Sequence, residues 1–192
     1  MAEKTKLSKE LIVNEALDIA EKEGFPFVTM ATISRSLSIK SPSLYNYFNG
    51  LAEIHKAMAL SAMDHLFEWL HKKTADKASG KEKIHALSAA YISFGLEHPG
   101  FYEATLKAPD PLDKEIQKSG ERIVTLSTMA IDSYYLKEVD QVHLVRGLRS
   151  MLHGMVDLHQ KNGFQLSVSL EESLKVIVDT YIQGVTEKFG NG

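Results

Sequence analysis

The sequence predicts an all-α protein, and three observations support that fold class. Apolar residues recur at helical spacing along the chain, and no stretch alternates every second residue between hairpin turns. Capping residues and helix-stopping glycines also separate the periodic segments. The 192 residues, 44% apolar and 24% charged, suffice for one or two globular domains. We therefore expect nine helices.

The first two helices are short and lie near the N-terminus. Ser8 is expected to cap the first, and Gly24 is expected to stop it. Thr29 is expected to cap the second, whose inner face carries Ile33 and Leu37 four residues apart. Both helices should therefore bury one apolar stripe.

The third helix follows the "SLSIK" turn. Ser41 is its expected N-cap, and Pro42 takes the first helical position, where a missing N–H costs nothing. The helix is expected to end near Phe48.

Six further helices are expected, and two begin with capping-box motifs, "SGKE" and "SLEE". Their expected positions are from Leu51 into "HKKTADK", from Ser79 toward His98, a short helix from Pro99, from Asp110 to about Tyr135, 139–161, and from Ser169 to about Phe189. The long helix from Leu51 is expected to join the N-terminal and C-terminal parts as a rigid connector.

Composition excludes several classes of protein. The absence of cysteine excludes disulfides, thiolate nucleophiles and cysteine-based zinc sites. No apolar run reaches the roughly 18 to 20 residues of a membrane helix, and "MAEKTKLSKE" is too polar for a signal peptide. We expect a cytoplasmic protein without membrane contact. The net charge of -3 does not favour nucleic acid, although the N-terminal end is weakly basic.

The three N-terminal helices have the spacing of a helix-turn-helix, because four residues separate the second from the third. In that geometry Leu44 and Phe48 anchor the third helix, which lies in the DNA major groove. The outward side chains carry hydroxyls, an amide and aromatic edges suited to phosphates, sugars and thymine methyls. They are Ser43, Tyr45, Asn46 and Tyr47. The N–H groups at the helix starts near Thr29 and Ser41 add two anion sites.

Residues 28–54, "VTMATISRSLSIKSPSLYNYFNGLAEI", resemble the DNA-binding domain of the TetR/AcrR transcriptional regulators. The matching residues are Ile33, Leu37, Ile39, Leu44, Tyr45 and Phe48. The resemblance implies DNA contacts at Thr29, Ser41, Pro42, Ser43, Tyr45 and Tyr47. It also implies a dimer that binds a palindromic operator.

Four residues depart from the family pattern. Ser34 replaces an alanine, Ser38 the turn glycine, Tyr47 a histidine, and Leu51 a lysine that contacts phosphate. A serine forced to positive φ at Ser38 costs on the order of 1 kcal/mol relative to glycine. We expect Lys40 and the N-terminal arm to supply the missing charge, with Lys56 as an alternative. The arm lysines are Lys4, Lys6 and Lys9.

Two later segments, "HPGFYEATL" (98–106) and "LRSMLHGMVDLHQ" (148–160), resemble the ligand-binding domain named for a Trp-His-Gly motif, although no tryptophan precedes His153 and Gly154. The resemblance implies an effector site among helices four to eight and a homodimer through the last two helices. Independently, the ninth helix carries a wide apolar stripe for a core and a partner. Its members are Leu174, Ile177, Val178, Tyr181, Ile182 and Val185.

The candidate effector residues are mostly aromatic, which suggests a hydrophobic or aromatic small molecule. They are Trp69, Tyr91, Tyr102, His153 and Asp157. The aromatic residues also suit an ordinary core. His153 and Asp157, four residues apart, could contact an effector or a metal, and a polar contact between helices is the favoured interpretation.

The sequence therefore predicts a regulator with a DNA-binding domain at 1–50 and an effector-binding and dimerisation domain at 51–192. We expect a repressor released by its effector, with an activator as the less favoured role, and no catalytic residue, metal or cofactor. Two alternatives stay open: a helical interaction module that does not bind DNA, and a metalloenzyme. The metalloenzyme would use Glu68-x-x-His71 and Glu82-x-x-His85, which have the spacing of di-iron ligands.

Overall fold

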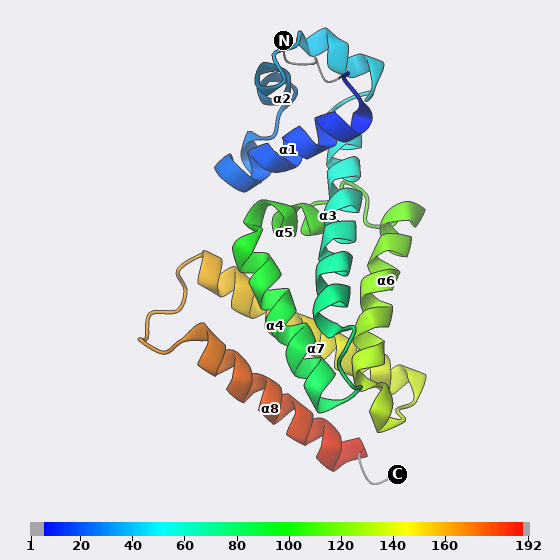
Figure 1. The fold of residues 1–192 in the computed structure, drawn as a ribbon, viewed down its shortest axis with the longest axis vertical. Helices are drawn as coiled ribbons and strands as arrows, with labels where there is room; N and C mark the ends of the chain where they lie inside the picture. Colours follow the sequence, from blue (N-terminus) through cyan, green and yellow to red (C-terminus); the bar gives the residue numbers. More distant parts are fainter. Residues whose placement is uncertain (1–5, 190–192) are drawn as a thin grey trace. The chain divides into compact units, whose positions relative to one another are not determined.

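The structure is a computed structural model that describes residues 6–189, and within that range every regular element is helical (Figure 1). Across these described residues, eight α-helices and three short 3-10 helices follow one another. The α-helices are α1 Lys9–Glu23, α2 Met30–Ser36, α3 Leu51–Thr74, α4 Lys81–Glu97, α5 Pro99–Leu106, α6 Lys114–Ile131, α7 Glu138–Gln160 and α8 Leu170–Phe189. The 3-10 helices are η1 Phe25–Phe27, η2 Ser41–Asn46 and η3 Asp132–Tyr134. With η2 as the third helix, the nine predicted helices are confirmed.

The caps of α1 and α2 form as predicted. Ser8 Oγ accepts a hydrogen bond from the Leu11 backbone N–H at 3.1 Å. Gly24 ends α1 with φ of 103°, a conformation that glycine adopts without strain. Thr29 Oγ1 accepts from the Thr32 N–H at 3.0 Å.

The third helix differs from the prediction in type and in its cap. It is a 3-10 helix, in which the Ser43 N–H donates to the Lys40 carbonyl at 2.8 Å. Lys40 is the N-cap, so the prediction that Ser41 caps this helix is wrong. The reason is that Ser41 Oγ is hydrogen-bonded to Ser34 Oγ at 2.8 Å.

The two predicted capping boxes have different outcomes. The one at Ser79 is wrong, because Ser79 Oγ accepts from the Ser133 N–H at 2.9 Å, and Glu82 lies 3.7 Å from Lys77. At the start of α8, Ser169 Oγ accepts from the Glu172 N–H at 3.0 Å, as predicted.

The start of α6 lies later than the sequence predicted. Asp110 Oδ1 accepts from the Leu112 N–H, at 2.9 Å, in a turn that precedes the helix. Asp113 Oδ1 accepts from the N–H groups of Glu115 at 2.9 Å and Ile116 at 3.4 Å, and α6 begins there. Two aspartates with the same local preference thus competed for one helix start.

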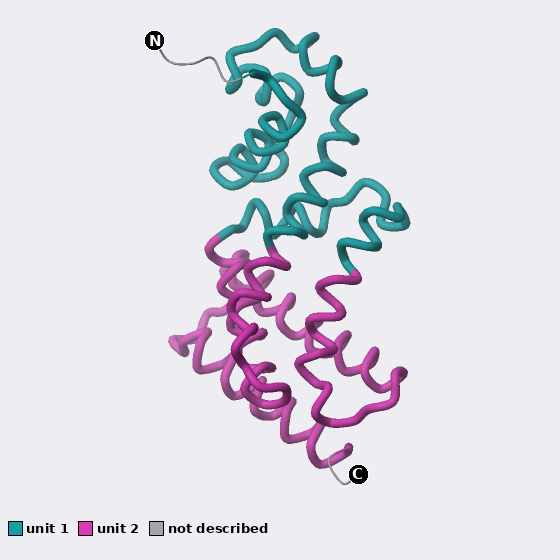
Figure 2. The backbone as a smooth tube through the Cα atoms, turned by 45° about the vertical axis from the view of Figure 1, so that its right-hand side comes forward, with its two compact units in different colours: residues 1–65, 98–120 teal, residues 66–97, 121–192 magenta. Residues whose placement is uncertain are grey.

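Two compact units make up the chain: residues 1–65 with 98–120, and residues 66–97 with 121–192 (Figure 2). Helix α3 contributes residues to both units. The predicted boundary at residue 50 concerns where DNA binding and effector binding reside, and it stays a prediction.

The core of the first unit is built mainly from α1 to α3, and α5 completes it. Ile12, Leu17, Ile33, Leu44 and Ile54 are fully buried there. Ala104 of α5 belongs to the same apolar cluster.

Helix α5 approaches α1 closely. A Cβ atom on Gly100 would lie 2.3 Å from the Glu21 backbone nitrogen. The Glu21 carboxylate accepts from the N–H groups of Gly100 at 2.8 Å and Phe101 at 3.2 Å. It therefore satisfies donors that the first turn of α5 leaves unpaired.

The second unit packs α4 against α7 and α8. Ile84, Leu148, Val156 and Val178 are buried in its interior. Among the helices of residues 6–189, none combines the length and apolar character needed to cross a membrane.

Candidate nucleic-acid interface

The segment 41–48, which contains η2, turns two apolar side chains inward and one aromatic side chain outward. Leu44 and Phe48 are 0% and 3% exposed, which confirms their predicted burial, whereas Tyr45 is 59% exposed. The ammonium group of Lys9 lies 5.1 Å from the centre of the Phe48 ring and covers it from α1. Leu44 and Phe48 thus anchor the segment to the core, while the Tyr45 ring remains exposed to solvent.

The other predicted DNA contacts divide by exposure. Lys40, Pro42 and Asn46 are exposed, and Ser41 and Ser43 are partly exposed. Together with Tyr45 they form a surface of hydroxyl, amide, ammonium and aromatic groups. Such groups suit phosphates, sugars and base edges.

The hydroxyls of Thr29 and Tyr47 already have partners within the protein. Thr29 Oγ1 accepts from the Thr32 N–H, and Thr32 Oγ1 accepts from the Thr29 N–H at 2.9 Å. The half-buried Tyr47 donates its hydroxyl proton to the Leu7 carbonyl at 2.9 Å, which ties η2 to the segment before α1. A DNA contact by either residue would therefore use its other atoms.

Two of the departures that the sequence showed lie at the turn between α2 and η2: Ser38 in the turn itself and Ser34 near the end of α2. Ser38 adopts φ of 54°, so the serine occupies the left-handed conformation that glycine favours. The Ile39 N–H donates to the Ser34 carbonyl at 2.9 Å and closes the turn. Ser34 therefore holds the turn through its backbone carbonyl and η2 through its side chain. Sequence analysis missed this role, although it noted the substitutions at Ser34 and Ser38.

The lysines near this surface differ in their partners. Lys56 Nζ lies 2.8 Å from the Asp113 carboxylate and 2.5 Å from that of Glu115. Hydrogen bonds with Asp113 first and Glu115 second raise the pKa of Lys56 above its ordinary value. Lys56 is therefore paired within the first unit, and its role as the alternative phosphate contact stays a prediction.

The arm lysines are only partly described. Lys9 lies 3.4 Å from Glu53, Lys6 is exposed, and Lys4 lies outside the described residues. Glu53 also accepts from the Asn49 backbone N–H at 2.8 Å, and this bond is the largest cause of its lowered pKa. Glu53 thereby holds the residues before α3 at the start of that helix, a role that sequence analysis missed.

The predicted effector residues are divided between the two units. Trp69 donates its indole N–H to the Ala90 carbonyl at 3.0 Å in the second unit. Tyr91, which is buried, belongs to the same unit, as does His153, whereas the buried Tyr102 belongs to the first. That these residues bind one effector stays a prediction.

Asp157 has a partner one helical turn further along the chain. It forms an ion pair at 2.6 Å with Lys161, the residue directly after α7. The predicted polar contact of His153 and Asp157 between helices stays a prediction.

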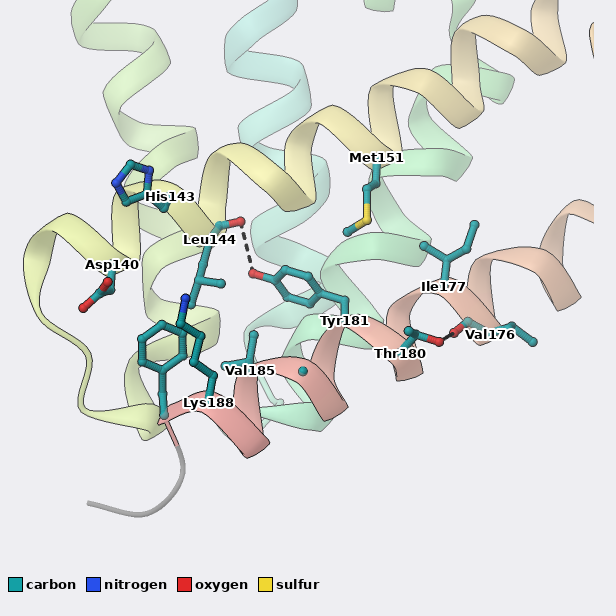
Figure 3. A pocket seen from close by; sticks show the side chains of 12 residues that line it. Asp140, His143, Leu144, Met151, Val176, Ile177, Thr180, Tyr181, Val185 and Lys188 are labelled. Carbon is teal, nitrogen blue, oxygen red and sulfur yellow. Dashed lines mark hydrogen bonds between the residues drawn. The ribbon is translucent and has the colours of Figure 1, made fainter.

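An open pocket of about 580 Å³ lies between α7 and α8 (Figure 3). The Tyr181 ring enters it from α8, and its hydroxyl donates to the Leu144 carbonyl of α7 at 3.1 Å. Burial raises the pKa of Tyr181 to about 12, so the hydroxyl keeps its proton. The lining is largely apolar, with Met151, Ile177 and Val185 around the ring, and it contains none of the predicted effector residues.

The Glu-x-x-His residues have separate partners. Glu68 lies 3.6 Å from Arg122, and His85 Nε2 lies 3.0 Å from Asp179. Across residues 6–189, no group of three or more histidines and carboxylates is placed to hold a metal ion.

Comparison with known proteins identifies the class to which this fold and surface belong. Residues 84–181, about half of the chain, match the family described as the tetracyclin repressor-like C-terminal domain. The chain belongs to the TetR family of helix-turn-helix transcription regulators. Members of this family are DNA-binding regulators rather than enzymes, and they typically act as dimers that respond to small molecules.

Individual relatives agree with this assignment. The chain is 33% identical over 186 residues to YobS, an uncharacterised HTH-type transcriptional regulator of Bacillus subtilis, and the match covers 96% of each chain. It is 23% identical over 127 residues to IcaR of Staphylococcus epidermidis, an HTH-type negative regulator of the biofilm operon icaADBC, covering 66% of this chain and 69% of IcaR. The fold is similar to a Rhodococcus protein of unknown function, with a TM-score of 0.80, 17% identity, and coverage of 96% and 98% of the two chains.

Proposed function

We propose that this regulator is a homodimeric repressor that binds a palindromic operator through η2 and is released by a small-molecule effector. The observation that carries the proposal is the division of segment 41–48, which contains η2, into a buried face with Leu44 and Phe48 and an outward face with Tyr45. An exposed aromatic residue on a firmly anchored short helix is costly to leave in water and useful against DNA. A repressor that binds operator DNA acts on the chromosome, so we place this protein in the cytoplasm.

The contacts proposed with DNA follow from the chemistry of each group. The Tyr45 ring packs on a sugar or a thymine methyl, and its hydroxyl reaches a phosphate. Lys40 supplies positive charge to the backbone, and Asn46 and Ser43 add hydrogen bonds. Thr29, Pro42 and Tyr47 contribute backbone or apolar contacts, because the two hydroxyls have internal partners.

The proposed dimer pairs α7 and α8 with the same helices of a second copy. Val176, 65% exposed, and Val142, 41% exposed, present apolar surface on these helices, and the pocket around Tyr181 adds more. Exposed apolar side chains beside an apolar pocket support an interaction site on these two helices. A dimer is also what a palindrome requires, because two recognition elements must reach major grooves about 34–36 Å apart.

The proposed effector is hydrophobic or aromatic and binds the helical part beyond residue 50, near Trp69, Tyr91, Tyr102, His153 and Asp157. A ligand that prefers the non-binding conformation about 100-fold supplies about 2.7 kcal/mol, which is enough to weaken an operator complex strongly. The name of IcaR, a negative regulator, supports repression as the sign of regulation.

The test is a selection of DNA sequences by the purified protein, followed by titration of the selected operator. We expect a palindromic sequence, binding of one dimer, and a loss of roughly 1–3 kcal/mol in Tyr45→Ala with its fold unchanged. Val176→Glu should abolish dimerisation and operator binding together, whereas Lys175→Glu, the adjacent position outside the pocket, should retain the dimer. Selection of no sequence, or full operator binding by a monomeric variant, would contradict the proposal.

A further inference from the structure

Two serine hydroxyls meet across the turn between α2 and η2. Ser34 Oγ and Ser41 Oγ are 2.8 Å apart, and Ser34 Oγ donates to the Ala31 carbonyl at 3.1 Å. Ser34 is 4% exposed, whereas Ser41 is partly exposed on η2. The pair therefore connects a buried polar group to the outward surface.

The number of protons decides the direction of these hydrogen bonds. Each hydroxyl carries one proton and can accept two hydrogen bonds. Because Ser34 is shielded from water, its proton must go to an acceptor within the protein. If that proton goes to Ala31, the proton between the two serines comes from Ser41, and two protons make two bonds. If Ser34 donated to Ser41 instead, its contact with Ala31 would lack a proton.

The first arrangement makes both internal bonds, and hydrogen bonds in such a chain strengthen one another. We propose that Ser34 makes Ser41 an acceptor-only group on the DNA-facing surface, so that Ser41 recognises a base amino group. With its proton committed to Ser34, Ser41 cannot donate to a phosphate oxygen, but the lone pairs of its oxygen can accept.

The preference for a base follows from the groups in the major groove. Adenine N6 and cytosine N4 are the donors there, whereas the corresponding groups of guanine and thymine are acceptors. Ser41 therefore favours adenine or cytosine at one position of each half-site. The inference rests on the proposed function, because it specifies a contact of the same DNA-binding surface.

The experiment compares base preferences among matched serine variants. The operator is first selected with the unchanged protein, and binding is then measured at fixed salt for all four bases at every half-site position. The variants are Ser41→Ala, Ser34→Ala and the control Ser36→Ala, whose exposed hydroxyl on α2 is bonded to Glu15 instead. Thermal unfolding verifies that each variant is folded, and salt dependence reports the phosphate contacts.

We expect Ser41→Ala to lose about fivefold of its preference for adenine or cytosine at one position, the value of one hydrogen bond. Ser34→Ala frees the Ser41 proton, so the preference at that position should shift toward guanine or thymine. Ser36→Ala should keep the original preferences.

A loss of affinity in Ser41→Ala that is the same for all four bases at every half-site position would show a contact with the DNA backbone and overturn the inference. An unchanged preference in Ser34→Ala would overturn it as well. In both cases the selected operator would leave the proposed function standing, whereas a failure of the unchanged protein to select any sequence would overturn both.

Discussion

The exposed groups on the first unit and on the second unit differ in chemical character. Around η2, the exposed groups are polar or amphipathic, and buried contacts hold several of them in place, as Ser34 holds Ser41. On α7 and α8 of the second unit, the exposed groups include valines, and the adjoining pocket is apolar. The comparison teaches that a polar partner suits the first surface and an apolar partner the second. We also expect substitutions around the first surface to destabilise the protein more than substitutions on the second.

The largest expected effect tests that expectation in the core beneath η2. Phe48→Ala should cost about 3–5 kcal/mol of unfolding free energy, because it opens a cavity under the recognition helix. Val176→Ala, at an exposed position of α8, should change the folding of a single chain by less than about 0.5 kcal/mol. Denaturant unfolding at several protein concentrations measures both. Similar losses in the two variants would remove the difference in tolerance between the units.

A second pair of variants compares glycines. Gly100→Ala should destabilise the first unit by roughly 3 kcal/mol or more, because its Cβ would meet the α1 backbone at 2.3 Å. Gly147→Ala, on α7, should instead stabilise by about 0.5–1 kcal/mol, since no described atom outside its local helix lies within 4 Å of the new Cβ. Melting temperatures of the two variants should move in opposite directions. A Gly100→Ala protein as stable as the original would mean that α5 can shift away from α1.

The first unit also contains a histidine that should make stability depend on pH. Burial is the larger cause that lowers the pKa of His55, against a hydrogen bond with the Val28 backbone that raises it. Its buried Nε2 has no hydrogen-bond partner among the described residues, so protonation there is unfavourable. The unfolded chain takes up this proton more readily than the folded chain. The contribution of neutral His55 to the free energy of unfolding is therefore fully present above about pH 6.5 and is lost as the pH falls.

The expected slope from this one group is at most about 1.4 kcal/mol per pH unit, and it ends below the folded pKa. His55→Gln should reduce the slope measured by denaturant unfolding between pH 7 and 5. His143→Gln, at an exposed position of α7, provides the control for removing a histidine. An identical slope in His55→Gln and the original chain would exclude this role.

The smallest expected effect concerns the turn before η2. Ser38→Gly should stabilise the protein by up to about 1 kcal/mol, because glycine adopts positive φ without strain. Ser38→Ala lacks that freedom and should bring no such gain. If thermal unfolding shows the glycine variant to be less stable, the greater freedom of its unfolded chain outweighs the relief of strain.

Local signals explain how much could be predicted. Ser8, Gly24 and Thr29 mark helix ends through contacts within a few residues, so the sequence sufficed to place them. The spacing of Leu44 and Phe48 likewise predicted which face of the third helix is buried.

Contacts between distant segments explain what could not be predicted. The choice between two aspartates at the start of α6 involves Lys56, which is paired with Asp113 from far along the chain. The partner of the Tyr47 hydroxyl, Leu7, is 40 residues away. Exposure of the outward side chains is visible in the structure, whereas their contacts with DNA stay predictions.

The docking of α5 on α1 has a consequence for how the protein is made. As a nascent chain leaves the ribosome, α1, α2 and η2 emerge well before residues 98–106, which carry Ala104 and the N–H groups that Glu21 binds. The core that supports η2 is therefore incomplete until a segment from the middle of the chain has been synthesised. A chimaera that transfers α1, α2 and η2 to another regulator therefore has to include α5 as well.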